Sequence, residues 1–228
     1  MYEEKIIPPK KAMPQAQDGT LRKFALRVPE VIYQCSGIMV FGKRIKSLVF
    51  STDLSIIKNV NADAIIAVYP FTPQPIITQA LLLAADIPVF AGVGGGLTKG
   101  QRVVNLAMFA EMQGATGVVL NAPTANAVVQ HVAETIDIPV VLTVARADTD
   151  FDARLQSGAN IFNVSAAAET PAIVRSIRER YPDVPIIATG GPTDESILET
   201  IQAGANAITW TPPSNGEIFR DIMAAYRD

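Results

Sequence analysis

The sequence predicts an α/β chain folded as a (β/α)8 barrel, because a repeat of strand and helix patterns runs through most of its length. Segments of the form Asp-Ile/Val-Pro-Val/Ile open β-branched runs typical of buried strands, at residues 86–89, 137–140 and 183–186. Gly-Ala pairs open a second set of apolar runs; their glycines lie at 114, 158 and 204, with spacings of 44 and 46 residues. Half of that spacing, about 23 residues, is the length of one strand and one helix with short loops.

This period places eight strand–helix units after residue 45. We expect the strands at residues 46–51, 64–68, 88–91, 117–120, 139–144, 160–164, 185–189 and 206–211. We expect the helices at residues 54–60, 75–85, 100–113, 124–136, 151–157, 167–180, 193–203 and 215–226. Strands that alternate with helices pair in parallel, and eight such units close into a barrel. The alternative is an open doubly wound sheet, which has no need of a strict two-unit repeat.

Details of the helices agree with this assignment. The third predicted helix has an apolar stripe at helical spacing, formed by Val103, Leu106, Ala107 and Ala110. The glycines of the Gly-Ala pairs directly follow predicted helix ends, where a residue of left-handed conformation commonly ends a helix.

We expect one domain over residues 1–228, made of three parts. Residues 1–36 form an N-terminal arm, with a short helix at 21–34. Residues 37–45 alternate apolar side chains around a Gly42-Lys43 turn and predict a β-hairpin that closes the bottom of the barrel as a structural plug. Residues 46–228 form the barrel.

Composition excludes several classes of protein. The chain has 228 residues, of which 49% are hydrophobic and 18% charged, which excludes a disordered chain. Cys35 is the sole cysteine, so no intramolecular disulfide forms, and a reducing cytoplasmic location is expected. We expect neither a signal peptide nor a membrane span. A net charge of −3 disfavours nucleic-acid binding through bulk electrostatics.

Ligands of such barrels bind at the carboxyl ends of the strands, and two loops there suit a phosphate. Ala188-Thr189-Gly190-Gly191-Pro192 follows the seventh predicted strand, and a Thr-Pro-Pro-Ser-Asn-Gly segment at 211–216 follows the eighth. With these loops the chain resembles the phosphate-binding TIM barrels of the aldolase type, the ribulose-phosphate-binding group. The resemblance implies a phosphate held by the backbone of Gly190, Gly191, Ser214, Asn215 and Gly216. The alternative is that Ser214 and Glu217 form a capping box that only caps a helix.

A second glycine-rich loop follows the third predicted strand. It predicts a flexible lid over the substrate, formed by Gly94, Gly95 and Gly96 with Lys99 reaching an anion. The spacing does not match a dinucleotide-binding fingerprint. A hinge exposed to solvent, with no ligand, is the alternative.

Candidate catalytic side chains lie at the remaining strand ends. Asp53 or Asp148 would move a proton, Arg146 and Asn163 would orient the substrate, and Asn121 would polarise a carbonyl. Each has a structural alternative. Asp53 would cap a helix, Arg146 would pair with Asp148, and Asn121 would form an Asx-turn. A magnesium ion between Asp53 and Asp148 is a further alternative; otherwise no metal site is expected.

Other chemistries are excluded by the residues themselves. His131, the sole histidine, falls in the middle of a predicted helix, outside the mouth of the barrel. Cys35 precedes the barrel. No lysine follows Lys99, so the later strands offer no amine for a Schiff-base aldolase.

The sequence therefore predicts a cytoplasmic enzyme that acts on a small phosphorylated metabolite, by carbonyl proton transfer, C–C lyase or hydrolase chemistry, with no cofactor. One alternative is a non-catalytic sensor that resembles the glycerol-phosphate antiterminators, with an RNA-binding arm containing Lys5, Lys10, Lys11, Arg22 and Lys23. Another is an FMN-binding barrel, because the hairpin resembles that of dihydroorotate-dehydrogenase-like barrels. The apolar helix at 76–85 leaves a homo-oligomer open.

Overall fold

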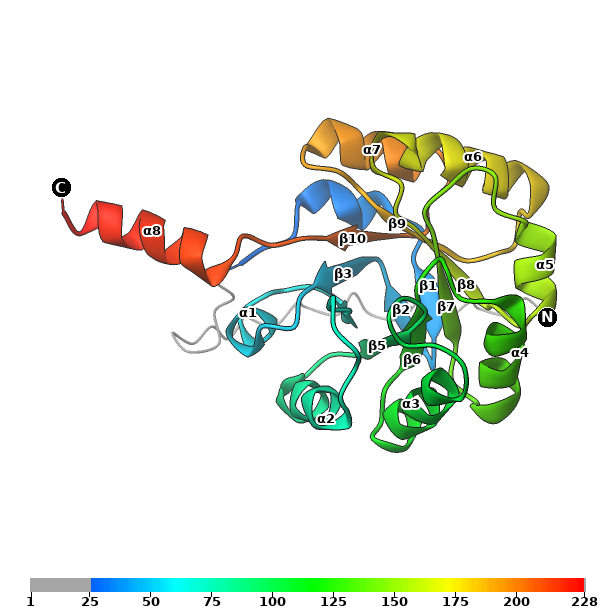
Figure 1. Ribbon diagram of the computed structural model, residues 1–228. Helices are drawn as coiled ribbons and strands as arrows, with labels where there is room; N and C mark the ends of the chain where they lie inside the picture. The colour runs from blue at the N-terminus through cyan, green and yellow to red at the C-terminus, as the bar shows by residue number, and fades with distance from the viewer. Residues whose placement is uncertain (1–25, 228) are drawn as a thin grey trace, which may run out of the picture.

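The computed structural model describes residues 26–227 and contains a closed barrel of parallel strands (Figure 1). Around the barrel the strands follow the order β10-β3-β4-β5-β6-β7-β8-β9. They are β3 (Ser47–Phe50), β4 (Ala64–Ala67), β5 (Val89–Gly94), β6 (Gly117–Leu120), β7 (Val140–Val144), β8 (Ile161–Val164), β9 (Ile186–Thr189) and β10 (Ala207–Trp210). The predicted (β/α)8 barrel is confirmed, and the open doubly wound sheet is excluded.

A helix follows each barrel strand, as predicted. The helices are α1 (Leu54–Lys58), α2 (Pro75–Ala84), α3 (Gln101–Met112), α4 (Asn126–Thr135), α5 (Phe151–Gln156), α6 (Thr170–Arg180), α7 (Asp194–Gln202) and α8 (Asn215–Ala225). The helix boundaries agree with the predicted ones to within two residues, except that the segment predicted as a single helix at 167–180 opens with a separate 3-10 turn, η3 (Ala167–Glu169), before α6. None of the described helices combines the length and the apolar character needed to cross a membrane.

The interior of the barrel is a packed apolar layer that extends into the predicted hairpin. Inward-facing side chains of alternate positions, such as Leu48, Phe90 and Ile187, form one buried cluster. The antiparallel strands β1 (Ile38–Val40) and β2 (Lys43–Ile45) add Ile38, Val40 and Ile45 to that same cluster. The hairpin therefore closes the N-terminal end of the barrel, as predicted.

The Gly-Ala repeat has a structural explanation. After α5 and α7, Gly158 and Gly204 adopt φ values of +98° and +116°, which end the helices. The residue two positions later is an asparagine each time. The side-chain oxygens of Asn160 and Asn206 accept the backbone N–H of Val140 and Ile186, each 2.8–2.9 Å away at the start of the neighbouring strand. The repeat thus aligns the beginnings of adjacent strands.

The segment before the hairpin packs on the outside of the barrel. Within it, residues Glu30–Gln34 form a 3-10 helix, η2, and Val28, Ile32 and Cys35 are buried in the outer core with Val49. The helix predicted at 21–34 is wrong over 26–29: Leu26 forms an isolated parallel bridge with Val60, and Pro29 is extended at the start of η2 and disfavours a helical residue before it. Residues 1–25 of the arm lie outside the described residues, together with the proposed RNA-binding side chains Lys5, Lys10, Lys11, Arg22 and Lys23.

The eighth helix forms where it was predicted, but it does not join the ring of helices. Figure 1 shows α8 extending away from the barrel, in line with β10, whereas α1 to α7 surround the strands. The connection contains Pro212 and Pro213. Proline fixes φ and holds the preceding residue in an extended conformation, so this connection resists the turn that would bring α8 back.

We predict that Asn206→Ala destabilises the protein by about 1–3 kcal/mol, because it removes the acceptor of the Ile186 N–H. It also removes an acceptor of the Arg178 guanidinium, 2.6 Å away. Urea denaturation measures the effect. The control is Asn105→Ala on the exposed face of α3, for which we expect a change within about 0.5 kcal/mol. Equal effects of the two substitutions would contradict a strand-aligning role for Asn206.

Candidate functional site in the barrel mouth

Four uncharged polar side chains form one half of the floor of the mouth. They occupy the inward-facing position above the apolar interior layer on β7 to β10, and they are Thr143, Asn163, Thr189 and Thr209. Their places follow from the alternation of each strand, since Val141, Ile161, Ile187 and Ala207 belong to the interior cluster two positions earlier. No ionisable side chain stands at this level on these strands, so the floor is neutral.

Two of these side chains have polar atoms without a partner. The Oδ1 atom of Asn163 and the Oγ1 atom of Thr209 are buried and make no hydrogen bond within the described residues. The Nδ2 atom of Asn163 lies 3.4 Å from Thr143 Oγ1, a long hydrogen bond. A buried polar atom left unpaired costs about 1–3 kcal/mol. Such atoms at the mouth of a barrel are suited to pair with a bound ligand.

Sequence reasoning identified Asn163 but missed Thr209. Thr209 is 6% exposed and stands two residues after inward-facing Ala207 on the last strand. The period-two pattern of residues 207–209 could have revealed it. Thr143 was missed in the same way, inside a strand that reads as a continuous apolar run.

The other half of the mouth contains a cavity of about 160 Å³. It is bounded by the ends of β4, β5 and β6 and by the predicted lid; its lining includes Val68, Tyr69, Gly92, Gly94, Gly96, Thr98 and Asn121. Thr98 is 3% exposed, and its hydroxyl has no partner within the described residues. Asn121 therefore lines the mouth, as predicted, and Thr98 joins it.

The predicted lid is held against its neighbours. The backbone N–H of Gly95 donates to Thr98 O at 2.9 Å, which closes a tight turn. A Cβ atom at Gly95 would lie 1.9 Å from Thr124 Oγ1 and 2.9 Å from Asn121 N. The glycine is thus required by close approach to the loop after β6. Lys99 is exposed beside this turn, and whether the loop moves remains a prediction.

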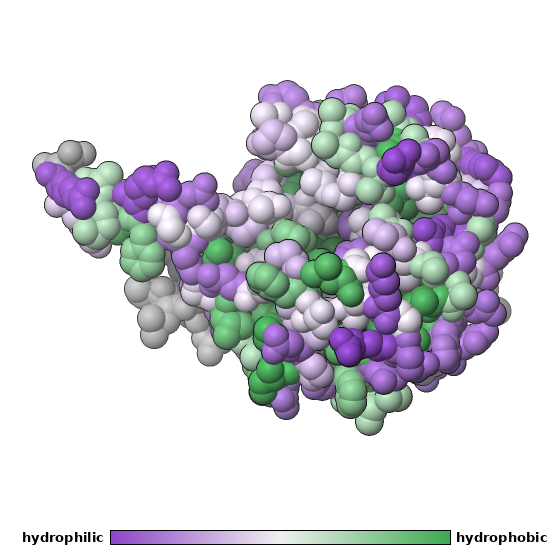
Figure 2. Space-filling model, viewed as in Figure 1, coloured by the Kyte–Doolittle hydropathy of each residue, from purple (hydrophilic) through white to green (hydrophobic). Residues whose placement is uncertain are grey.

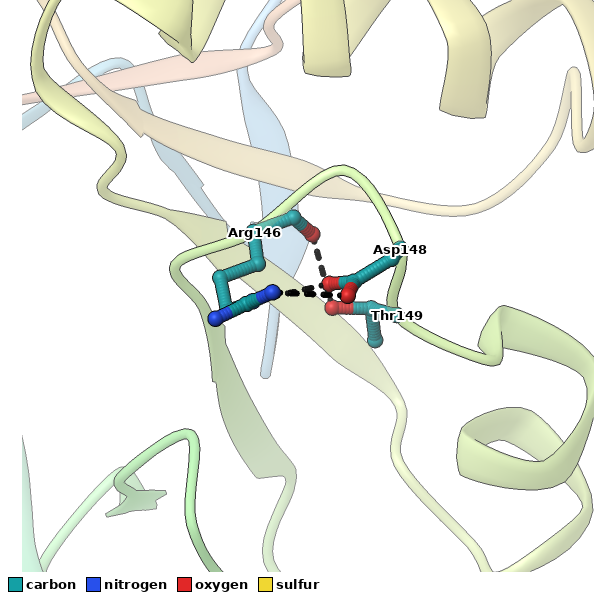
Figure 3. Close-up of polar contacts among 3 residues, drawn as sticks. All are labelled: Arg146, Asp148 and Thr149. Carbon is teal, nitrogen blue, oxygen red and sulfur yellow. Dashed lines mark hydrogen bonds and ion pairs between the residues drawn. The ribbon is translucent and has the colours of Figure 1, made fainter.

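Arg146 and Asp148 lie on the loop after β7 and pair with each other (Figure 3). Arg146 donates from Nε to Asp148 Oδ1 at 2.9 Å and from Nη2 to Oδ2 at 2.8 Å. The hydrogen bond raises the pKa of Arg146 and lowers the pKa of Asp148. Both side chains are mostly exposed, at 79% and 68%. The structure thus contains the ion pair that was the alternative to separate catalytic roles.

A wide cavity of about 520 Å³ separates this loop from the loop after β6. Arg154 of α5 lines this cavity and donates to the carbonyl oxygens of Thr124 and Ala122 and to Asn126 Oδ1. Arg154 fixes the shape of the loop after β6. The sequence did not single it out, because nothing local shows that an arginine in a short helix will reach three acceptors about 30 residues earlier.

Asp53 joins the beginnings of α1 and α8. Its Oδ1 atom accepts the N–H groups of Ser55 and Ile56 and the Ser55 hydroxyl, and so caps α1. Its Oδ2 atom accepts from Asn215 Nδ2 at 2.5 Å. The Ser55 hydroxyl is the main cause of the lowered pKa of Asp53, with the two backbone N–H groups contributing. The structure thus brings together a predicted acid and a predicted phosphate ligand, in a capping arrangement.

The predicted phosphate loops are occupied in part by their own helix caps. Ser214 and Glu217 form the capping box that was the alternative interpretation. At α7, Thr193 and Ser196 form another, and Asp194 and Glu195 stand in the first turn. Gly190 is buried, and a Cβ there would lie 2.7 Å from Ile197; Gly191 and Gly216 are exposed. The polar contacts of Asn215 among the described residues run to α1 rather than to Gly190 or Gly191.

No family model matches the sequence, and no curated protein matches it. Solved structures share the fold. The phosphoenolpyruvate phosphomutase of Streptomyces platensis subsp. rosaceus superposes with a TM-score of 0.59 at 15% identity, over 79% of this chain and 80% of that one. A 2,3-dimethylmalate lyase, described as a member of the PEP mutase/isocitrate lyase superfamily, gives 0.58 at 11% identity, over 86% and 82%. These likenesses show a TIM barrel, and they support the resemblance to aldolase-type barrels only at that level.

Another similar structure, phosphonopyruvate hydrolase in complex with oxalate and Mg++, gives a TM-score of 0.58 at 13% identity, over 81% of this chain and 80% of that one. The described residues of this chain contain no group of three or more His, Cys, Asp or Glu side chains that could hold a metal. Asp53 and Asp148, the predicted pair, are engaged by Asn215 and Arg146.

The positions of Cys35 and His131 are consistent with their exclusion as catalytic residues. Cys35 is buried, and burial raises the pKa of its thiol to about 12, so a thiolate does not form near neutral pH. His131 is exposed on α4, away from the residues that line the mouth.

We predict that Asp53→Ala lowers the stability at pH 7 by about 0.5–2 kcal/mol through loss of the cap, whereas Asp53→Asn retains most of it. Because folding lowers the pKa of Asp53, the ionised carboxylate stabilises the fold above the unfolded-state pKa of about 3.9. The part of the stabilisation that depends on the charge disappears as the pH falls through the lower folded-state pKa. Urea denaturation from pH 7 to pH 3 should therefore show the wild type and Asp53→Ala converging. Parallel curves over this range would contradict a capping carboxylate.

Proposed function

We propose that the chain is an enzyme that binds a small phosphorylated metabolite in the barrel mouth, with an oxygen-bearing part of the substrate against Asn163 and Thr209. The observation that carries this proposal is the pair of buried, unpartnered oxygens at the carboxyl ends of β8 and β10. Asn163 Oδ1 can only accept, so the ligand must present a donor such as a hydroxyl. The Thr209 hydroxyl can donate to a carbonyl or alkoxide oxygen.

A division of roles follows from the charges. The neutral floor orients the substrate and stabilises a developing oxyanion through the amide of Asn163, and Asn121 can do the same from the other half of the mouth. Proton transfer must come from the rim, where Asp148 stands beside Arg146 and where the hydroxyl of Tyr69 accepts the Gln74 N–H at 2.9 Å. Carbonyl proton transfer, C–C cleavage and hydrolysis are all compatible with these groups. Asp53 acts in this scheme by positioning α1 and α8.

The phosphate is proposed to lie at the loop after β9 and the start of α8. Gly191 and Gly216 are exposed there and carry no side chain that would cover their N–H groups. The carboxylates of Asp194, Glu195 and Glu217, in the first turns of α7 and α8, would repel a phosphate dianion and weaken its binding. We therefore expect the affinity to depend on the neutral floor as well as on the phosphate.

We predict that Thr209→Val raises the stability of the ligand-free protein by about 1 kcal/mol, because it removes an unpartnered hydroxyl and keeps the shape of the side chain. Urea denaturation measures the gain. Stability sacrificed at a position for ligand binding is typical of a functional site. The control is Thr200→Val on α7, where the hydroxyl donates to Ser196 O at 2.9 Å and its loss should destabilise. A destabilising Thr209→Val would show that its hydroxyl already has a partner.

A thermal-shift screen of triose to hexose phosphates, each beside its unphosphorylated counterpart, tests the function. A ligand at about 100 times its dissociation constant adds about 2.7 kcal/mol, which is roughly 5–10 °C for a chain of this size. We expect the shift to vanish in Asn163→Leu, to weaken in Gly191→Asp and to persist in the surface control Asn105→Leu. Equal shifts with unphosphorylated compounds would contradict the phosphate, and a shift unchanged in Asn163→Leu would contradict the site.

A further inference from the structure

The two halves of the barrel mouth differ in chemistry. On β7 to β10, the inward positions nearest the mouth hold the four polar side chains of the floor. On β3 and just after β4, the equivalent positions hold Phe50 and Val68, two residues after inward-facing Leu48 and Ile66. Phe50 is 40% exposed, so apolar surface remains uncovered in this half of the mouth. In Figure 2, hydrophobic residues gather on the side of α1 and α2, whereas hydrophilic residues cover the side of α4 and α5.

The cavity of about 160 Å³ in the apolar half of the mouth is neutral. Within residues 26–227, no residue of its lining carries a charge at neutral pH. Phe71 and Leu97, which belong to the loops after β4 and β5, line the cavity and are 71% and 82% exposed. They leave apolar surface that a ligand can cover. A charged group would lose its hydration in this cavity without gaining an ionic partner from the lining.

Thr98 supplies a polar group of this cavity that has no partner. Its side chain lines the cavity and is 3% exposed, and its Oγ1 atom makes no hydrogen bond in the described part of the chain. The turn closed by the N–H of Gly95 on Thr98 O holds the residue in place. Since an unpaired buried hydroxyl is costly, its position in a cavity of ligand size points to a ligand that supplies the missing hydrogen bond.

The volume and the lining together define the chemical group that fits. A cavity of about 150 Å³ accepts a group of the size of benzene, so this cavity accepts at most about six carbon atoms. The hydroxyl of Thr98 can donate to a carbonyl oxygen or accept from a hydroxyl. A carboxylate or a phosphate does not suit the neutral lining. A fully hydroxylated sugar does not suit it either, because hydroxyls against the apolar side chains would be left unpaired.

We propose that this cavity binds the uncharged end of the substrate, an aliphatic group of up to about six carbon atoms whose one carbonyl or hydroxyl oxygen is hydrogen-bonded to Thr98. The inference rests on the proposed function, because it assigns the second end of the same phosphorylated metabolite. The substrate is then a phosphate ester with an aliphatic keto or hydroxy end, and hexose phosphates are poor ligands.

Binding of cyclopentanone to the full chain, measured by saturation-transfer NMR, tests the cavity without a phosphate. This compound is uncharged, has one carbonyl oxygen and is close in size to benzene. We expect a dissociation constant on the order of millimolar, as is common for so small a ligand. The matched charged compound, cyclopentanecarboxylate, should show no binding, because the lining offers its charge no partner. Absence of cyclopentanone binding, or equal binding of the carboxylate, overturns the proposal.

Two variants locate this binding. Thr98→Val should weaken it about two- to tenfold, with a melting temperature no lower than that of the wild type, because the hydroxyl has no partner to lose. Gly96 lines the cavity without a left-handed φ, and a Cβ there would lie 3.7 Å from Asn121 Nδ2, so Gly96→Leu should fold and weaken binding at least about tenfold. The controls Thr135→Val and Asn105→Leu, on exposed positions of α4 and α3, should bind as the wild type does. Undiminished binding in both Thr98→Val and Gly96→Leu overturns the site.

Phosphate esters separate this inference from the proposed function. An alkyl phosphate of about six carbon atoms with a ketone near its free end should raise the melting temperature more than hexose phosphates do at equal concentration. The difference should disappear in Gly96→Leu. Equal shifts with both kinds of ester overturn this inference and leave the proposed function standing. Binding of cyclopentanone with no shift from any phosphate ester supports the cavity and contradicts the proposed function.

Discussion

Closure of the parallel barrel is the constraint on which the other features depend. Parallel strands that are buried on both faces must be β-branched and apolar along their length, and every carboxyl end then meets at one mouth. On β7 to β10, polar residues interrupt the apolar strands at the inward position nearest that mouth. Asn163 and Thr209 occupy that position, so the closure that buries them also directs them to one shared space.

The beginnings and the ends of the strands have different roles in this chain. At the beginnings, Asn160 and Asn206 pair with the backbone of the neighbouring strand and set its register, and the hairpin fills the space below. At the ends, polar atoms remain without partners. The charged groups of the mouth, such as the Arg146–Asp148 pair, lie on the exposed rim rather than on the floor. A neutral floor with a charged rim suits the binding of an uncharged, oxygen-rich part of a substrate inside and of its ionic group at the edge.

The N-terminal segment and the last helix are linked by competition for the same surface. Val28, Ile32 and Cys35 cover the outside of the barrel beside β3, close to where an eighth helix would pack. With that surface partly covered and with Pro212 and Pro213 in the connection, α8 projects away from its own barrel (Figure 1). The N-terminal segment thus covers part of the outer surface of the barrel that α8, which projects from it, leaves free.

The sequence alone determined the barrel, the hairpin plug and most element boundaries, because strand and helix periods, the repeat and the proline and glycine positions are local signals. It also identified Asn163 and Asn121 and gave the correct structural alternatives for Asp53, Ser214 and the Arg146–Asp148 pair, since caps and short-range ion pairs depend on neighbours in the chain. Only the tertiary structure decided which inward-facing atoms lack partners, as at Thr209, and which distant acceptors Arg154 reaches. It also decided that α8 stands apart, because the surface available to that helix depends on a segment about 185 residues earlier. Hydrogen-bond satisfaction and burial are properties of groups brought together by the closed barrel, and no local pattern contains them.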